Sequence, residues 1–383
     1  MRRFLTLIPF CFAVTYPLVA QVVDASACDI LANPQSFDGK MVRIKGTVVA
    51  GFEEFAIKAS GCNQGAIWLA YPEGTKAKAG PVAVVQTQLG RNNPSPVANP
   101  NRSAVKLEKN KDFKQFDSLL STPYKSGGMC LGCVRYTVTA TLTGRLDGTK
   151  DTGVIRAKDA KFVGVNGFGN LNNYSARLVL QSVSDVIPQE IDYAQNAAAS
   201  KDDSQRESAG GDPVAAVHQI GRAFGPGSAA GSEVERAAAA YGKEGEDNGV
   251  EVGFGIPNEV PKNDSPKGDR NSPDGLLFNC TFNMERLKGE ALTRAISHVG
   301  THIADIRGSQ STVKADNAYG LEHHAWQTTI LSAIGSGQKT LTLPGGYLVW
   351  NSAWPEADRN KMVEAAISKF LADWESLNST ARQ

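Results

Sequence analysis

Two neighbouring stretches hold four of the five histidines of this 383-residue chain: ALTRAISHVGTHIADI at residues 291–306 and YGLEHHA at residues 319–325. Apolar residues recur at steps of three and four in the first stretch. This spacing predicts an amphipathic helix with one apolar stripe, formed by Leu292, Ile296, Val299, Ile303 and Ile306. His298 and His302 stand four residues apart, so both imidazoles lie on one helix face, one turn from each other.

Two imidazoles in this arrangement can share a metal ion, and a carboxylate from a second helix would complete a three-ligand zinc set. Glu322, in the second stretch, is the candidate for the third ligand. Asp305 follows His302 by about one helical turn and is a candidate to orient it. The alternative interpretation is that the two histidines are ordinary buried hydrogen-bonding residues and that Asp305 is solvated near the helix end.

The two stretches resemble the gluzincin metallopeptidases, in which His-Glu-x-x-His on one helix and a glutamate on the next helix bind zinc. Glu322 follows His302 by 20 residues, the separation found in well-known members. A peptidase-like segment of bacterial RHS-type toxins, His-Glu-Gly-Ser-His-Val-Ala-Asp, is similar to HVGTHIAD at residues 298–305. The resemblance covers about residues 275–335, and it implies a zinc site made by His298, His302 and Glu322.

Position 299 departs from the gluzincin pattern, because it holds valine where those enzymes hold the glutamate that acts as general base. Zinc lowers the pKa of its bound water, but a nearby base must still accept the proton. Val299 also falls on the apolar stripe, so we expect it to be packed in the core. His323 and His324 are possible substitute bases or a fourth ligand. Adjacent helical residues point about 100° apart, so at most one of them faces the same ion.

The first half of the chain has the alternating pattern of half-buried strands. We expect strands at residues 41–49, 55–57, 66–71, 135–146 and 176–183, with Gly46 at a bend in the first. Residues 72–132 are rich in Pro, Asn, Gly and Lys and are interpreted as a loop carrying one short helix near Phe113 and Phe116. Five strands with a helix between the third and fourth resemble an OB-type barrel over residues 27–190.

Two segments of this half, residues 39–46 and 167–172, are similar to exported bacterial proteins of unassigned function. An OB-type barrel also offers a surface for saccharides or single-stranded nucleic acid. Stacking on bases needs exposed aromatic side chains, and the candidates are Phe52, Trp68 and Tyr71.

Residues 1–20 have the features of a secretory signal peptide, with a basic start and a proline-broken apolar run ending at Ala20. Its removal would leave 38 basic and 39 acidic residues, a formal charge of about −1, and no segment long enough to span a membrane. Such a charge gives no electrostatic reason to bind nucleic acid. We therefore expect a secreted or periplasmic protein with no nucleic-acid partner and no transmembrane segment.

Export to an oxidising compartment favours disulfide bonds. The candidates are Cys28, Cys62, Cys130 and Cys133, which allow three connectivities. Cys28 is alternatively a lipidation site. The remaining cysteine, Cys280, lies in an apolar run, so we expect its side chain to be buried and unreactive.

The sequence therefore predicts two domains, an all-β OB-like barrel at 27–190 with an insertion at 72–132, and an α+β zincin-like domain at 214–383. A polar linker joins them at 191–213. The predicted function is that of a pseudo-metallopeptidase that keeps zinc ligands, lacks the base and acts by binding a peptide, protein or saccharide. The alternatives are an active zinc hydrolase with a substitute base and a binding module that acts through the barrel.

Overall fold

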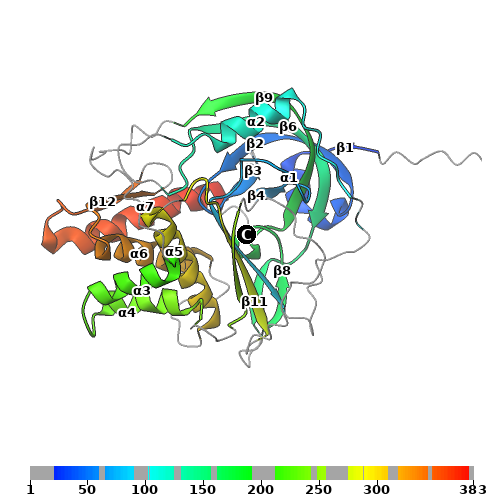
Figure 1. The fold of residues 1–383 in the computed structure, drawn as a ribbon. Helices are drawn as coiled ribbons and strands as arrows, with labels where there is room; N and C mark the ends of the chain where they lie inside the picture. The colour runs from blue at the N-terminus through cyan, green and yellow to red at the C-terminus, as the bar shows by residue number, and fades with distance from the viewer. Residues whose placement is uncertain are drawn as a thin grey trace, which may run out of the picture.

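The protein is described here by a computed structural model that covers residues 21–59, 65–89, 102, 104–124, 131–156, 162–191, 212–242, 248–255, 275–287, 289–308, 318–343 and 347–378. The predicted signal peptide and nearly all of the predicted linker lie outside these ranges. Residues 344–346, where the sequence Pro-Gly-Gly predicts a turn, also lie outside them. A barrel and a group of helices lie on either side of a small sheet (Figure 1).

Five strands form a closed barrel: β2 (Met41–Ala50), β3 (Phe55–Lys58), β4 (Ala66–Ala70), β6 (Tyr136–Gly148) and β9 (Ala176–Glu190). Their order is β2-β3-β4-β9-β6, and the barrel closes because β6 also pairs with β2. The β4–β9 pair is parallel and the other pairs are antiparallel. The five predicted strands are thus confirmed, although β9 extends seven residues beyond its predicted end.

Buried and more exposed residues alternate along β2, as in a barrel strand, and Val42, Ile44 and Val48 are buried inside the barrel. Gly46 continues this buried face, and a Cβ atom added to it would lie 2.5 Å from the side chain of Ile57. Gly144 in β6 is tighter still, because an added Cβ would lie 2.2 Å from the carbonyl oxygen of Val179 in β9. The barrel therefore needs these glycines where neighbouring strands approach closely.

The insertion at residues 72–132 carries the predicted helix, α2 (Lys111–Ser121), whose Phe113, Phe116 and Leu120 are buried in the barrel core. The interpretation of the rest as loop was wrong for β5 (Ala83–Leu89), which is a strand. This strand pairs antiparallel with β11 (Leu276–Phe282), and β11 pairs parallel with β10 (Val250–Phe254). One strand of this three-stranded sheet thus comes from the middle of the barrel sequence.

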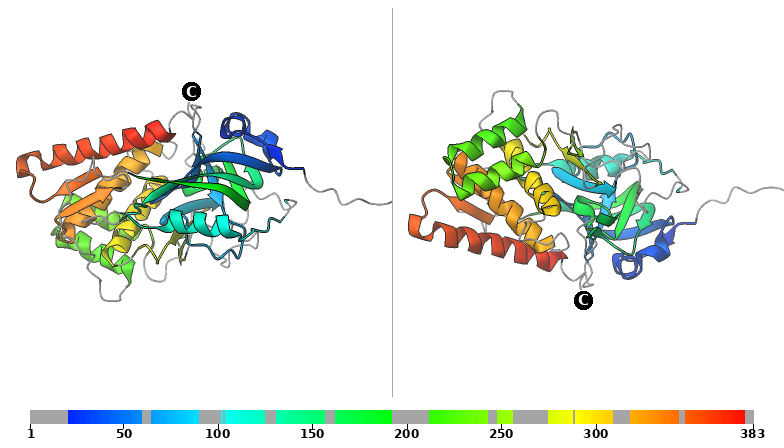
Figure 2. Two further views of the ribbon diagram at one scale, coloured as in Figure 1. Left: turned by 90° about the horizontal axis from the view of Figure 1, so that it is seen from above. Right: turned by 90° about the horizontal axis from the view of Figure 1, so that it is seen from below.

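The second half, called the helical unit below, contains α3 (Pro213–Ala223), α4 (Ala229–Ala239), α5 (Glu290–Arg307), α6 (Ala318–Gly335), α7 (Arg359–Asn378) and the hairpin β12 (Thr340–Leu343) with β13 (Tyr347–Asn351). Helix α7 runs along the outer side of this unit in both views of Figure 2. None of the described helices is long and apolar enough to cross a membrane.

Helix α5 is the centre of the helical unit and contacts α3, α4, α6, β5 and β11. The sequence predicted one apolar stripe, but fifteen of its eighteen residues are buried, because neighbours cover the polar faces as well. From the sequence alone we expect this helix to begin at Met284. The observed helix begins at Glu290, since Gly289 precedes it with a positive φ of 52°, which a continuing helix does not allow.

Shorter elements complete the fold: β1 (Val23–Asp24), α1 (Ala27–Ala32), β7 (Gly153–Arg156), β8 (Phe162–Asn166) and the 3₁₀ turns η1 (Pro34–Phe37), η2 (Asn170–Asn172) and η3 (Glu356–Asp358). Strands β7 and β8 form a hairpin that the sequence did not predict.

The described cysteines occur in two states. Cys280 is free and buried, as expected, and Cys28 and Cys133 are disulfide-bonded. Cys62 and Cys130 lie outside the described residues, so the connectivity stays a prediction.

Candidate metal centre

Four side chains with metal-binding atoms converge between the barrel and the helical unit: Glu53, His298, His302 and Glu322. His298 and His302 lie one turn apart on α5, and Glu322 lies in the first turns of α6. Glu53 comes from the turn between β2 and β3. The structure thus brings together the three predicted ligands and adds a fourth residue, the carboxylate of Glu53 from the barrel.

The nitrogen and oxygen atoms of this cluster lie close together. The Nε2 atoms of His298 and His302 are 3.1 Å apart. Glu53 Oε2 lies 3.4 Å from the first and 3.6 Å from the second. Glu322 contacts the same two atoms, with Oε2 3.6 Å from His298 Nε2 and Oε1 3.6 Å from His302 Nε2.

These separations match a four-coordinate metal site. Ligands about 2.0–2.1 Å from a tetrahedral zinc ion lie about 3.3 Å from one another. The five atom pairs range from 3.1 to 3.6 Å, and one ligand atom from each residue lies within 4.8 Å of the others. The four residues therefore fit a divalent cation of the size and preference of zinc.

The tautomer of His298 is set by Thr329 on α6. The Thr329 hydroxyl donates its one hydrogen to the carbonyl oxygen of Ala325 at 2.8 Å. It can therefore only accept from His298 Nδ1, which lies 3.1 Å away. Nδ1 thus carries the hydrogen and Nε2 points its lone pair into the cluster, as a metal-binding histidine requires.

The charges of the buried side chains in the cluster favour a bound cation. The side chains of both histidines are fully buried, and those of Glu53 and Glu322 are 9% and 10% exposed. Burial alone would lower the pKa of His298, but Glu53 and Glu322 outweigh it and raise this pKa to about 9. Burial alone would raise the pKa of Glu53, but the two histidines outweigh it and the pKa is lowered. A divalent ion would take the place of the proton on His298 Nε2 and would balance the charge of the two carboxylates.

Val299, which follows His298 on α5, is fully buried in the core of the helical unit, as the sequence predicted. The apolar surroundings extend around the site. Phe52 lies edge-on to His298 with ring centres 5.1 Å apart, and Trp326 lies 4.2 Å from the same ring. The cluster is thus a polar group of four side chains in a packed apolar shell.

His324 belongs to a second, charged network that joins α4, α5 and α6. Its Nδ1 lies 2.8 Å from Asp305 and its Nε2 lies 3.1 Å from Glu233. The hydrogen bonds that His324 donates to the carboxylates of Asp305 and Glu233 raise its pKa to about 9. Asp305 is buried and also accepts a hydrogen bond from Arg236 at 2.8 Å. The observed partners of Asp305 are therefore His324 and Arg236, and both ring nitrogens of His324 are engaged.

His323 points in another direction, as adjacent helical residues must. Its Nε2 lies 3.2 Å from Glu364 on α7, and its ring stacks on Tyr319. Neither His323 nor His324 is a member of the four-residue cluster.

The three aromatic residues considered for stacking on bases are buried, with 3% of Phe52, 3% of Trp68 and none of Tyr71 exposed. Trp68 and Tyr71 belong to the barrel core, and Phe52 packs on the helical unit. They are therefore not available as an exposed stacking surface.

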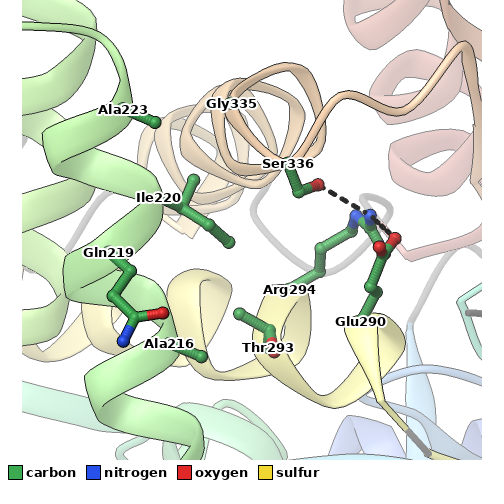
Figure 3. Close-up of a pocket in the computed structure, with 9 residues that line it drawn as sticks. All are labelled: Ala216, Gln219, Ile220, Ala223, Glu290, Thr293, Arg294, Gly335 and Ser336. Atoms are coloured by element: carbon green, nitrogen blue, oxygen red, sulfur yellow. Dashed lines mark hydrogen bonds and ion pairs between the residues drawn. The ribbon is translucent and has the colours of Figure 1, made fainter. Parts of the chain in front are cut away.

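A separate cavity of about 240 Å³ lies between α3, α5 and the end of α6 (Figure 3). In it, the guanidinium of Arg294 donates to Glu290 at 2.9 Å and to the Ser336 hydroxyl at 3.1 Å. None of the four cluster residues lines this cavity.

Sequence reasoning missed Glu53, which precedes His298 by about 245 residues. Helical spacing links His298 to His302, but no spacing rule reaches from a barrel turn to a helix in another part of the chain. The local sequence offers only two adjacent glutamates, Glu53 and Glu54, in a tight turn. Charged turns of this kind are common on protein surfaces, so they do not indicate a metal ligand.

No protein-family model matches this chain, and neither a curated protein nor a solved structure does. The interpretation of the centre therefore rests on its own geometry.

Proposed function

We propose that this chain is an exported two-domain metalloprotein whose helical unit descends from a zinc metallopeptidase and has lost peptidase activity. In this proposal the barrel is of the OB type, His298, His302 and Glu322 bind zinc, and the protein acts by binding or interaction in the periplasm or outside the cell.

The observation that supports metal binding is the cluster itself: two histidine nitrogens lie 3.1 Å apart, and two carboxylates lie within 3.6 Å of them. Two facing Nε2 lone pairs repel unless a proton or a metal lies between them. Thr329 holds His298 in the tautomer that suits a metal. Zinc bound there would act as a Lewis acid and lower the pKa of any water that it carries.

The loss of hydrolysis is supported by the side chains around the cluster. Val299 is packed in the core and carries no proton acceptor. His324 already uses both ring nitrogens, and His323 pairs with Glu364. Losing a general base costs about two to four orders of magnitude in rate.

One observation favours the competing proposal of an active zinc hydrolase. Glu53 places a carboxylate against both histidines, and a carboxylate there is chemically able to act as a general base. Its separations from the histidines equal those of Glu322 to within 0.2 Å, which supports a ligand position instead.

The test is metal analysis combined with an activity assay on the purified full chain. We expect one zinc per chain, lost in His298→Ala and kept in the control His323→Ala, and no chelator-sensitive cleavage of an unfolded protein substrate. Absence of zinc from the wild type would contradict the metal proposal, and chelator-sensitive cleavage would establish the hydrolase instead. Val299→Glu tests descent, because it restores the carboxylate of the peptidase pattern; gain of cleavage would support it.

A further inference from the structure

The turn that carries Glu53 is fixed in place by the start of β5. The backbone amides of Val82 and Ala83 both donate to the carbonyl oxygen of Phe52 at 2.8 Å. Gly132 packs on the other side, where an added Cβ would lie 2.6 Å from the Cα of Phe52. The turn between β2 and β3 is therefore held against the sheet that separates the barrel from the helical unit.

Asn170 in η2 orients the carboxylate itself. Its Nδ2 donates to Glu53 Oε2 at 2.9 Å, while its Oδ1 accepts from the backbone amide of Val85 at 2.8 Å. A single amide side chain thus connects β5 to Glu53, an arrangement typical of residues that orient a metal-binding carboxylate.

The backbone around Asn170 is strained, which fits a segment built for a specific position. Leu171 and Asn172 have positive φ angles of 51° and 57°. The Asn172 side chain holds this conformation by accepting from the amide and the hydroxyl of Thr87 on β5, at 2.8 and 2.9 Å.

The Glu53 carboxylate is incompletely partnered for a buried group. Its Oε1 is buried and has no hydrogen-bond partner among the described residues. The side chain is 9% exposed and its other oxygen points toward the two histidine Nε2 atoms. A buried carboxylate in this condition needs a cation beside it.

We propose that Glu53 is the fourth ligand of a closed metal site, and that a zinc-like divalent ion fastens the barrel to the helical unit while Asn170 positions Glu53. The inference rests on the proposed function and deepens it, since it assigns the metal a structural role. Structural zinc sites have four protein ligands, whereas catalytic sites keep a position open for water.

The direct test compares the zinc affinity of the wild type with that of Glu53→Gln, measured by competition with a chelating dye. Gln keeps an acceptor for Asn170 but removes the charge that binds zinc. The matched control is Glu54→Gln in the same turn, because Glu54 pairs with Lys58 and is not in the cluster. We expect Glu53→Gln to weaken binding by at least about 100-fold, and Glu54→Gln to leave it unchanged.

The role of Asn170 is tested with Asn170→Asp, which keeps the acceptor for Val85 and replaces the donor to Glu53 by a carboxylate. Asn172→Asp is its control, since Asn172 also bonds to β5 but has no bond to Glu53. We expect about a 10–100-fold loss of zinc affinity in the first and none in the second. The visible spectrum of bound Co²⁺, which reports coordination geometry, should change only in the first. Unchanged affinity and spectrum in Asn170→Asp would show that Asn170 has no positioning role.

Amide hydrogen exchange with and without zinc tests whether the ion connects the barrel to the helical unit. In the wild type we expect zinc to slow exchange in the turn at residues 51–54 as well as in α5 and α6, and in Glu53→Gln only in α5 and α6. Protection confined to α5 and α6 in the wild type, or equal affinity in Glu53→Gln, would overturn this inference and leave the three-ligand site intact. A wild type that binds no zinc would overturn both proposals.

Discussion

At the scale of single residues, the hydroxyl of Thr329 determines which nitrogen of His298 faces the cluster. The sequence predicted His298, His302 and Glu322 because helical spacing and a known motif relate them. It did not predict Thr329, since a threonine on a helix more commonly bonds only to the preceding turn.

Thr329→Val tests this orientation. Valine has nearly the same shape but cannot accept a hydrogen bond, so His298 loses the partner that fixes its tautomer. We expect about a tenfold or greater loss of zinc affinity by dye competition. Thr328→Val is the control, because Thr328 is equally buried on the same helix and its hydroxyl bonds to the carbonyl oxygen of His324. An equal loss in both variants would count against a role for the tautomer.

Asp147, in the barrel, is a buried carboxylate whose charge is balanced by arginines. Its carboxylate is fully buried and accepts hydrogen bonds from Arg145 at 2.8 Å and from Arg177 at 2.6 Å. Burial alone would raise its pKa, but Arg177 and Arg145 outweigh burial and the pKa is lowered. The stabilisation is therefore complete above the pKa of the unfolded chain, about 3.9, and is lost as pH falls through the lower folded pKa.

Asp147→Asn should therefore lower the free energy of unfolding at neutral pH by about 3–5 kcal/mol, because buried arginines lose their partner. The difference from the wild type should shrink as the pH falls below about 4. Urea unfolding at several pH values measures it, with the exposed Asp151→Asn as control. A difference that does not depend on pH would mean that the charge of Asp147 is not the cause.

At the scale of elements, alternation in β2 and runs of strand-forming residues predicted the five barrel strands, and helical spacing predicted α2 and α5. The strand pattern did not predict β5, because its polar residues Gln86, Thr87 and Gln88 are typical of a loop. This strand is stabilised by β11, nearly 200 residues later, and by side-chain amides from η2, and no local pattern contains those partners. Likewise, α5 has one apolar stripe in sequence, yet tertiary contacts bury all of its faces.

Gly144→Ala tests the close packing of β6 on β9. The added methyl group would meet the backbone of Val179 at 2.2 Å, and a backbone atom cannot move aside as a side chain does. We expect a loss of about 3 kcal/mol in the free energy of unfolding, at the upper end of over-packing costs. Gly255→Ala is the control, since nothing lies within 4 Å of its added Cβ. A loss no larger than that of the control would show that the strands separate easily.

At the scale of the whole molecule, the connections between the barrel and the helical unit include the pairing of β5 with β11, the packing of Phe52 on His298 and Trp326, and Glu53 in the cluster. The sequence predicted the three cluster residues that lie on two adjacent helices. It did not predict the fourth, Glu53, because the docking of two distant segments is set by tertiary packing.

We propose that one divalent metal ion lies between Glu53, His298, His302 and Glu322. Anomalous diffraction at the zinc absorption edge, from crystals of the full chain grown with zinc, would locate this ion. We expect one strong peak about 2.0–2.2 Å from a ligand atom of each of the four residues, with no water bound. The proposal would be contradicted by the absence of a peak there, or by a metal held by three residues and water with Glu53 turned away.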